Sequence, residues 1–121
     1  ITIVSYSNMV NVVKEALSSD ELSSLSVELI DLQTISPLDI ETILNSVRKT
    51  KKLLMAQEAP ANSSVGTTVI TKVVESEVFS DLLLSPQLIS GLHSPMPSAK
   101  HLESTVIPQV DDIIKKVKGM V

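Results

Sequence analysis

Two histidines are the residues of this chain most readily recruited for metal binding or proton transfer. His93 and His101 lie in one Pro-containing stretch, and the loop between them could bring their imidazoles together. A closed zinc site needs four ligands, however, and the chain has no cysteine to complete one. The sequence therefore predicts surface or interface histidines, and we assign no metal ligand to either.

Carboxylates offer the next candidates. Asp111 and Asp112 could coordinate a hard cation, but an acidic pair is also typical of the first turn of a helix, where it faces the positive end of the dipole. Glu58 stands where a strand-like run meets a loop, so its carboxylate could line a cleft, cap the following helix or accept a hydrogen bond at an interface. We favour the last two roles for Glu58 and assign no catalytic residue.

The glycines are too scattered to hold a phosphate group. A dinucleotide or P-loop cradle needs clustered glycines, so that backbone N–H groups can approach the phosphates. Gly66, Gly91 and Gly119 are far apart, and no Gly-x-Ser-x-Gly sequence forms a nucleophile elbow. The sequence predicts no cofactor-binding residue in this chain.

Two further segments could form binding surfaces. One is a basic cluster at the end of a predicted helix, which the helix dipole and solubility already explain: Arg48, Lys49, Lys51 and Lys52. The other is the loop of residues 94–99, where two prolines fix the backbone around the flexible apolar side chain of Met96. Such a loop suits a docking surface, and equally a rigid connection packed on its own domain.

Composition sets the kind of domain that must carry these residues. The chain has 121 residues, 43% of them hydrophobic, and a net charge of −4, which is enough for one packed core. Tyr6 and Phe79 are the only aromatic residues, so the core must be aliphatic, as in parallel sheets buried on both faces, and nucleic-acid bases find little to stack on. No apolar run approaches the roughly 18 residues of a membrane-spanning helix. We predict neither a nucleic-acid nor a membrane partner.

Strand-length apolar runs alternate with segments of helical spacing, which indicates repeated strand–helix units and the α/β class. The clearest boundary is Ser36-Pro37, which predicts a helix N-cap followed by proline at the first helical position, with Asp39 as the acidic member of a capping box. The expected strands lie at residues 1–5, 26–32, 53–57 and 87–90.

Residues 65–74 give conflicting signals. Their Val, Ile and Thr content favours a strand by propensity. Val65, Val69 and Val73 nevertheless recur every four residues, and a strand here would leave too little chain for a crossover between parallel neighbours. We predict a helix over this segment and a final helix that starts near Val110 and stops at Gly119.

Four strings, in order along the chain, resemble a known family: ITIVSYSNMV, VELIDLQTISPLDIETI, ISGLHSPMPSAKHLES and IPQVDDIIKKV. They are similar to the C-terminal domain of the β subunit of thiamine-diphosphate-dependent 2-oxo acid dehydrogenases, the decarboxylating component of the pyruvate and branched-chain complexes. The most specific matches are Asp31-Leu32 with Ser36-Pro37-Leu38-Asp39, and Pro95-Met96-Pro97 with Ala99, Lys100, Leu102 and Glu103.

The resemblance implies a fold and a division of labour. The fold is three-layer α/β/α, transketolase C-terminal-domain-like, with a mostly parallel sheet that carries one antiparallel edge strand. Thiamine diphosphate would bind in the parent enzyme outside this chain. The domain, residues 1–121 of a longer β subunit, would hold together the α subunit and a second β subunit of a heterotetramer, and would help to present a surface to the lipoyl-acyltransferase core. It would be inactive alone, with these interface residues: Glu58, Pro95, Met96, Pro97, Ala99 and Lys100.

Departures from the family pattern leave the substrate open. Glu58-Ala59-Pro60 looks like the branched-chain version, whereas the loop from Pro95 to Lys100 looks like the pyruvate version, and we favour the acetyl-transferring pyruvate enzyme. The pyruvate family often has an acidic residue ahead of Ala-Pro that helps bind the docking domain of the acyltransferase. This chain has Leu84 ahead of Ser85-Pro86, and Asp81 could substitute.

Two other functions are weighed against this one. A stand-alone ligand-binding or regulatory α/β module without enzymatic activity would hold its ligand at a strand end. A transketolase-type enzyme of sugar phosphates would need phosphate-binding Arg or His at strand ends, and the one arginine, Arg48, lies at a helix end. The family resemblance implies the cytoplasm of a bacterium, or the mitochondrial matrix or a plastid of a eukaryote.

Overall fold

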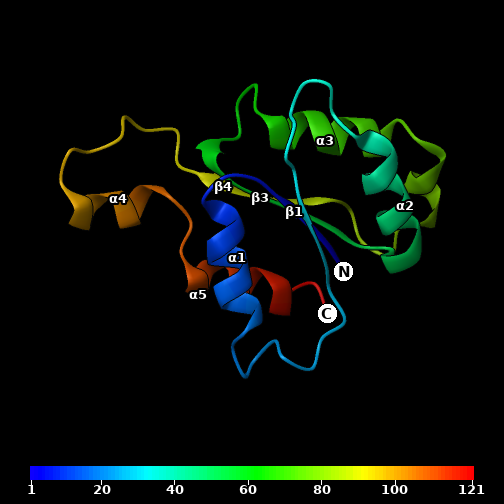
Figure 1. Ribbon diagram of the computed structural model, residues 1–121, viewed down its shortest axis with the longest axis horizontal. Coiled ribbons are helices and arrows are strands. Elements are labelled where there is room, and N and C mark those ends of the chain that lie inside the picture. The colour runs from blue at the N-terminus through cyan, green and yellow to red at the C-terminus, as the bar shows by residue number, and fades with distance from the viewer.

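One four-stranded sheet lies at the centre of the molecule (Figure 1). The structure is a computed structural model that describes residues 1–121. The strands are β1 (Thr2–Ser5), β2 (Glu28–Asp31), β3 (Leu53–Pro60) and β4 (Gln87–Gly91), in the order β2-β1-β3-β4. The helices are α1 (Met9–Leu17), α2 (Ile40–Thr50), α3 (Val65–Val74), α4 (Lys100–Val106) and α5 (Val110–Lys118), with a 3-10 helix, η1 (Glu77–Asp81). No helix is both long and apolar enough to cross a membrane.

All three strand pairs are parallel, which corrects one detail of the expected fold. The resemblance implies an antiparallel edge strand, and the structure has none. Each strand is joined to the next by a helical crossover that returns the chain to the same end of the sheet, so successive strands run in one direction. After β4 the chain continues as a Pro-containing loop and two helices, and it contributes no fifth strand.

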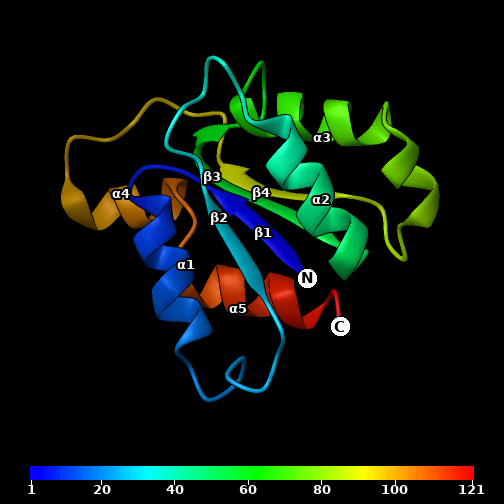
Figure 2. The same ribbon diagram turned by 45° about the vertical axis from the view of Figure 1, so that its right-hand side comes forward.

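Helices cover both faces of the sheet and make three layers (Figure 2). Alternate residues of the central strands point to opposite faces. Ile3 and Leu54 pack with α1 and α5, whereas Val4 and Met55 pack with α2, α3 and η1. Each of these four side chains is fully buried. The two aliphatic cores explain why a chain with only two aromatic residues still forms a packed domain.

The start of α2 lies three residues later than the sequence predicts. Ser36 and Pro37 precede the helix in an exposed turn with a cis Ser36-Pro37 peptide bond. Asp39 is the N-cap: its carboxylate accepts a hydrogen bond from the Thr42 backbone N–H at 3.1 Å. The Asp39 carboxylate also accepts a hydrogen bond from the Thr42 hydroxyl at 2.6 Å. Asp39 is therefore the N-cap residue that the sequence pattern predicted at Ser36.

The helical prediction for residues 65–74 is confirmed, since α3 spans Val65–Val74. Val69 and Val73 are fully buried against the sheet. Ser64 caps the helix in a capping box with Thr67. Gly66 lies against side chains of β3 and β4, and its N–H donates to Oε1 of buried Gln57 at 2.8 Å. Tertiary packing of the valine stripe thus overrides β propensity.

Candidate functional site

The carboxyl ends of β1 and β3 form the first candidate site. These neighbouring strands lead into helices on opposite faces of the sheet, α1 and α3, so their ends mark the switch point where open α/β sheets bind ligands. Asn8, just after β1, donates through Nδ2 to Oε1 of Glu58 at 3.4 Å. Glu58 does not cap α3, because Ser64 and Thr67 fill that role. Of the two roles that the sequence favours for Glu58, capping of the following helix is wrong, and an interface hydrogen bond stays a prediction.

Tyr6 lies at the same place, between β1 and α1. Partial burial, and then the nearby Glu58 carboxylate, raise the pKa of the Tyr6 phenol above its ordinary value. The phenol is therefore protonated at neutral pH and is available as a hydrogen-bond donor. The hydrogen bonds at this strand end place no base beside a hydroxyl nucleophile, and the arrangement is a polar surface rather than a catalytic constellation.

Neither histidine belongs to a metal site in this structure. His93 and His101 are both exposed, one beside the end of β4 and the other in α4. No three His, Asp or Glu side chains are grouped closely enough to hold a metal ion. Asp111 and Asp112 open α5, as their sequence context predicts, and Asp112 accepts the Gln109 backbone N–H at 2.8 Å.

The basic cluster near the end of α2 is committed to intramolecular contacts. Arg48 pairs with Glu77 at 3.0 Å, Lys49 with Glu28 at 2.6 Å and Lys51 with Asp81 at 3.5 Å. Lys52 donates to the Met120 carbonyl oxygen at 2.6 Å. These four cations join segments that lie far apart in the sequence, so the cluster is structural rather than a ligand site. Asp81, a candidate docking carboxylate, is held by Lys51.

Glu28 is the centre of a small polar network at the opposite end of the sheet. Its carboxylate accepts hydrogen bonds from the Lys49 ammonium at 2.6 Å and from the Ser46 hydroxyl at 2.5 Å. The Lys49 hydrogen bond, followed by that of Ser46, lowers the pKa of Glu28 below its ordinary value. Ser46 also bonds the buried Thr2 hydroxyl at 2.7 Å. This network ties α2 to β1 and β2.

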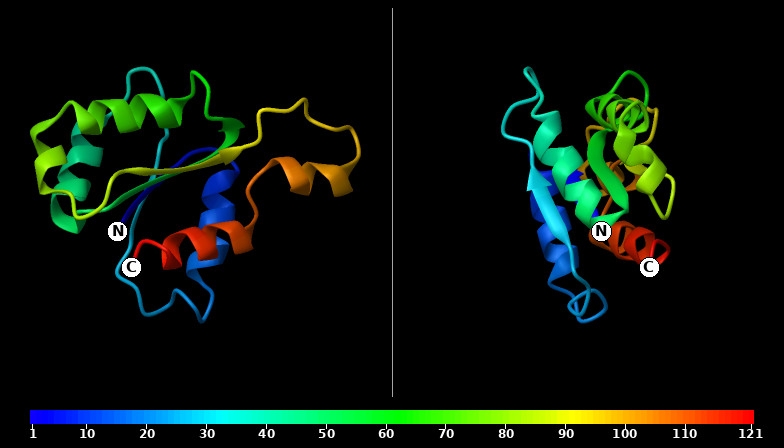
Figure 3. Two further views of the ribbon diagram at one scale, coloured as in Figure 1. Left: turned by 180° about the vertical axis from the view of Figure 1, so that it is seen from behind. Right: turned by 90° about the vertical axis from the view of Figure 1, so that its right-hand side faces the viewer.

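The predicted interface residues of the proline loop lie on an arm that projects from the domain (Figure 3). The arm comprises residues 92–108, and a hydrogen bond from the Leu92 N–H to the Val106 carbonyl oxygen closes its base at 2.8 Å. None of the seven residues of α4 is buried. Pro95, Met96 and Lys100 are exposed, Pro97 and Ala99 are half-buried, and Met96 is 56% exposed. The arm thus presents apolar side chains to its surroundings, including Leu92 and Leu102.

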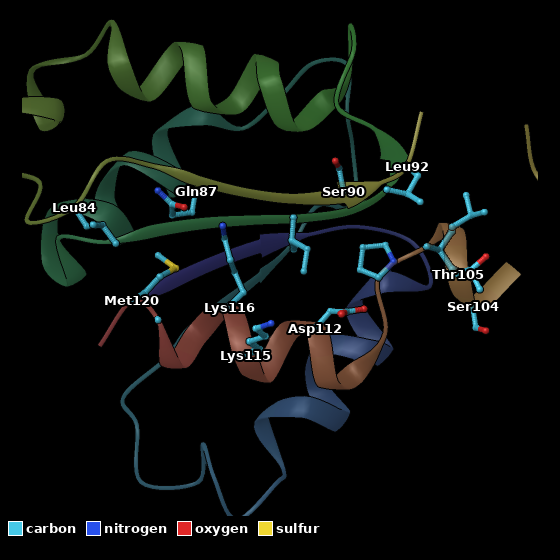
Figure 4. Close-up of a pocket in the computed structure, with 15 residues that line it drawn as sticks. Leu84, Gln87, Ser90, Leu92, Ser104, Thr105, Asp112, Lys115, Lys116 and Met120 are labelled. Atoms are coloured by element: carbon cyan, nitrogen blue, oxygen red, sulfur yellow. The ribbon is translucent and has the colours of Figure 1, made fainter. Parts of the chain in front are cut away.

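A cleft that the sequence analysis did not anticipate lies between β4 and α5 (Figure 4). Its volume is about 680 Å³. The sheet side is lined by Gln87, Ile89 and Ser90, and the helix side by Lys115 and Lys116. The cleft forms because α5 packs against α1 beneath β1 and β3, and leaves that face of β4 uncovered. No local sequence signal could have revealed it, because its walls meet only through the tertiary fold.

Comparison with known proteins relates this geometry to a family. The family described as "Transketolase, C-terminal domain" matches residues 1–113. The pyruvate dehydrogenase E1 component subunit beta of Rickettsia conorii is 36% identical over 118 residues, which cover 98% of this chain and 36% of that protein. The mitochondrial counterpart from Pisum sativum is 39% identical, with 98% and 33% covered. The chain therefore spans about a third of the length of these relatives.

A solved structure shares the fold. It is described as a split gene transketolase, inactive beta4 tetramer, and it superimposes with a TM-score of 0.73 over 98% of this chain and 38% of that chain. The two sequences are 21% identical. The likeness supports the layered α/β fold derived above.

Proposed function

Since this chain belongs to the transketolase C-terminal domain family, we propose that it is the subunit-assembly and docking domain of the β subunit of a 2-oxo acid dehydrogenase. The parent enzyme would oxidatively decarboxylate a 2-oxo acid and pass the acyl group to a lipoyl-acyltransferase. Pyruvate is the proposed substrate, because the relatives at 36% and 39% identity carry pyruvate dehydrogenase in their names. Residues 1–121 would form one domain of that longer subunit.

The observation that carries the proposal is the arm. A projection with no buried residue in α4 and with Met96 56% exposed has little to hold it in place within this chain. Large exposed apolar side chains gathered on one feature are typical of protein interfaces. We propose that Pro95, Met96, Pro97, Ala99 and Lys100 contact the α subunit or a second β subunit.

Glu58 would contribute a second contact, at the switch point. Its carboxylate shares one hydrogen bond with Asn8 and is otherwise free to accept donors from a partner chain. The neighbouring Tyr6 phenol would act as a donor there, because a phenol is protonated at neutral pH, and burial with the Glu58 carboxylate raises its pKa further.

The chain's own residues do not fit thiamine diphosphate. A diphosphate is held at a helix start by free backbone N–H groups, and the metal ion that accompanies it needs several oxygen ligands. The Gly66 N–H is committed to Gln57, and no group of three metal-ligating side chains exists. We propose that the cofactor binds elsewhere in the parent enzyme, we derive no step through it, and we expect the 121-residue chain alone to be inactive.

Co-purification of the longer β subunit with its α subunit tests the proposal. We expect the wild-type pair to form a heterotetramer by light scattering and Met96→Asp to weaken it, because the change places a carboxylate in an apolar contact. The matched control is Leu83→Asp, which alters an apolar side chain that is 74% exposed but precedes β4, at the other end of the sheet from the arm. Unchanged assembly of Met96→Asp, or equal loss in both variants, would refute the interface assignment.

A further inference from the structure

The outer edge of β4 has no strand partner. β4 is the last strand in the order β2-β1-β3-β4, and it pairs with β3 alone. No backbone group of Gln87–Gly91 makes a hydrogen bond outside the sheet, and the next residue that does is Leu92, at the base of the arm. A strand edge of this kind leaves alternate N–H and C=O groups available to another chain, and folded proteins usually cover it.

The cleft runs along this free edge. Gln87, Ile89 and Ser90 of β4 line it from the sheet side, and Leu84 and Met120 add apolar surface next to them. β4 has five residues, so a peptide of similar length in extended conformation would span roughly 17 Å beside it. A volume of about 680 Å³ has room for the side chains of such a segment that point toward α5.

The helix side of the cleft carries unpaired positive charge. Lys115 and Lys116 of α5 form no ion pair, whereas Arg48, Lys49, Lys51 and Lys118 each pair with a carboxylate within 3.5 Å. Figure 4 shows the Lys116 side chain rising from α5 toward the strands. Asp112 also lines the cleft and accepts the Gln109 N–H through Oδ2, so the two lysines outweigh one carboxylate and the lining has a net positive charge. Lys115 and Lys116 thus both line the space next to β4, and the Lys116 side chain reaches toward the strand.

The opposite edge of the sheet does not share these properties. The cavity beside β2 has a volume of about 230 Å³, and its lining includes the carboxylates of Asp31 and Asp39. No lysine or arginine lines it. Of the two free edges, only that of β4 combines an adjoining cleft with cationic side chains.

We propose that the cleft between β4 and α5 binds an extended acidic segment of a partner protein, which adds to the sheet as a strand beside β4. Main-chain hydrogen bonds to the β4 edge supply the pairing, and alternate side chains supply specificity. Because alternate side chains of an added strand point to opposite faces of the sheet, the acidic residues of the segment point toward α5 and contact Lys115 and Lys116, and the apolar residues between them point to the other face. This inference is independent of the subunit proposal, because it requires only residues of this chain.

Nuclear magnetic resonance titration of the 121-residue chain tests the inference. The probe is the peptide Ac-Val-Glu-Val-Glu-Val-NH2 at millimolar concentration, and its matched control is Ac-Val-Lys-Val-Lys-Val-NH2. We expect saturable shifts of the backbone amides of residues 87–91 with the acidic peptide, and at most weak shifts with the basic one. Equal shifts with both peptides, no shift at β4, or shifts confined to β2 would overturn the proposal.

Charge reversal tests the role of the two lysines. In the double variant Lys115→Glu/Lys116→Glu the acidic peptide should bind about tenfold more weakly, since two partly exposed attractions become repulsions. Lys72→Glu is the control, because Lys72 is exposed on α3, has no ion-pair partner and lies on the other face of the sheet. Lys72→Glu changes the net charge by half as much as the double variant, so a weakening of about threefold or more in Lys72→Glu would attribute the effect to net charge and overturn the site.

The unliganded chain provides a last test. We expect it to be monomeric by light scattering at the concentrations of the titration. A dimer whose β4 amide signals change on dilution would assign the edge to a second copy of this chain and would overturn the acidic partner. Because no α or second β subunit is present, these outcomes leave the assembly proposal untouched.

Discussion

Replacement of Gly66 by alanine should destabilise the domain, although alanine is the better helix former. Gly66 lies within α3, and helix propensity alone would favour Gly66→Ala by about 1 kcal/mol. The structure predicts the opposite sign. A Cβ atom on Gly66 would lie 2.5 Å from Oε1 of Gln57, 2.8 Å from Cδ1 of Leu88 and 2.9 Å from Cγ of Met55.

The size of the effect follows from two separate losses. Overpacking of a filled core costs about 1–3 kcal/mol. Displacement of Gln57 also breaks its buried hydrogen bond with the Gly66 N–H, and a buried polar group left without a partner costs about 1–3 kcal/mol. After the propensity gain is subtracted, we expect a net loss of about 3 kcal/mol in the free energy of unfolding.

Urea denaturation of the 121-residue chain, followed by circular dichroism, measures this loss. Gly119→Ala is the matched control, because the nearest atom to its added Cβ is 3.4 Å away and its φ is −70°. The free energy of unfolding of Gly119→Ala should equal that of the wild type or exceed it by about 0.5 kcal/mol, because alanine lowers the conformational entropy of the unfolded chain. A Gly66→Ala variant as stable as Gly119→Ala would refute the close approach of α3 to β3 and β4.

Three further outcomes are expected. Ile113→Asp should abolish cooperative unfolding, because it places an unpaired charge in the core between α5 and the sheet; a folded variant by circular dichroism would show that this face of α5 is wrongly assigned. Met96→Asp should leave the unfolding midpoint of the 121-residue chain unchanged, and a lower midpoint would mean that the arm packs on its own domain. The pKa values of Glu28 and Asp39 lie below their ordinary values of 4.5 and 3.8. The two carboxylates therefore stabilise the fold above these ordinary values, and this contribution is lost as the pH falls through the folded-state pKa values. Urea midpoints measured against pH should show a flatter acid decline in Glu28→Gln/Asp39→Asn.

The sequence predicts those parts of the fold that depend on short-range patterns. The valine stripe of α3, the acidic first turn of α5 and the four strand-length runs are each encoded within about ten residues, and the structure confirms them. The start of α2 was misplaced because Ser36 and Asp39 are both good N-cap residues, and only the backbone shows which side chain reaches the Thr42 N–H.

The surfaces depend on long-range contacts, which a single sequence does not contain. The basic residues at the end of α2 fitted a dipole explanation, yet their partners Glu28, Glu77 and Asp81 come from three other segments of the chain. The cleft beside β4 depends on where α5 packs, and α5 is separated from β4 by the whole arm. These ion pairs and the cleft depend on how the helices pack on the sheet, and the local periodicity of the sequence does not predict that packing.

Lys52 has a consequence for how the domain can be attached to other polypeptides. Its carbonyl oxygen accepts the Thr2 N–H at 2.8 Å, and its ammonium group donates to the Met120 carbonyl oxygen at 2.6 Å, so one residue fastens both ends of the chain. The termini accordingly lie close together in every view (Figures 1–3). A polypeptide fused before residue 1 or after residue 121 would leave from the amino end of the sheet and would keep clear of the arm. The same geometry makes the domain a good host for circular permutation, with a short Gly-Ser linker that joins the two ends.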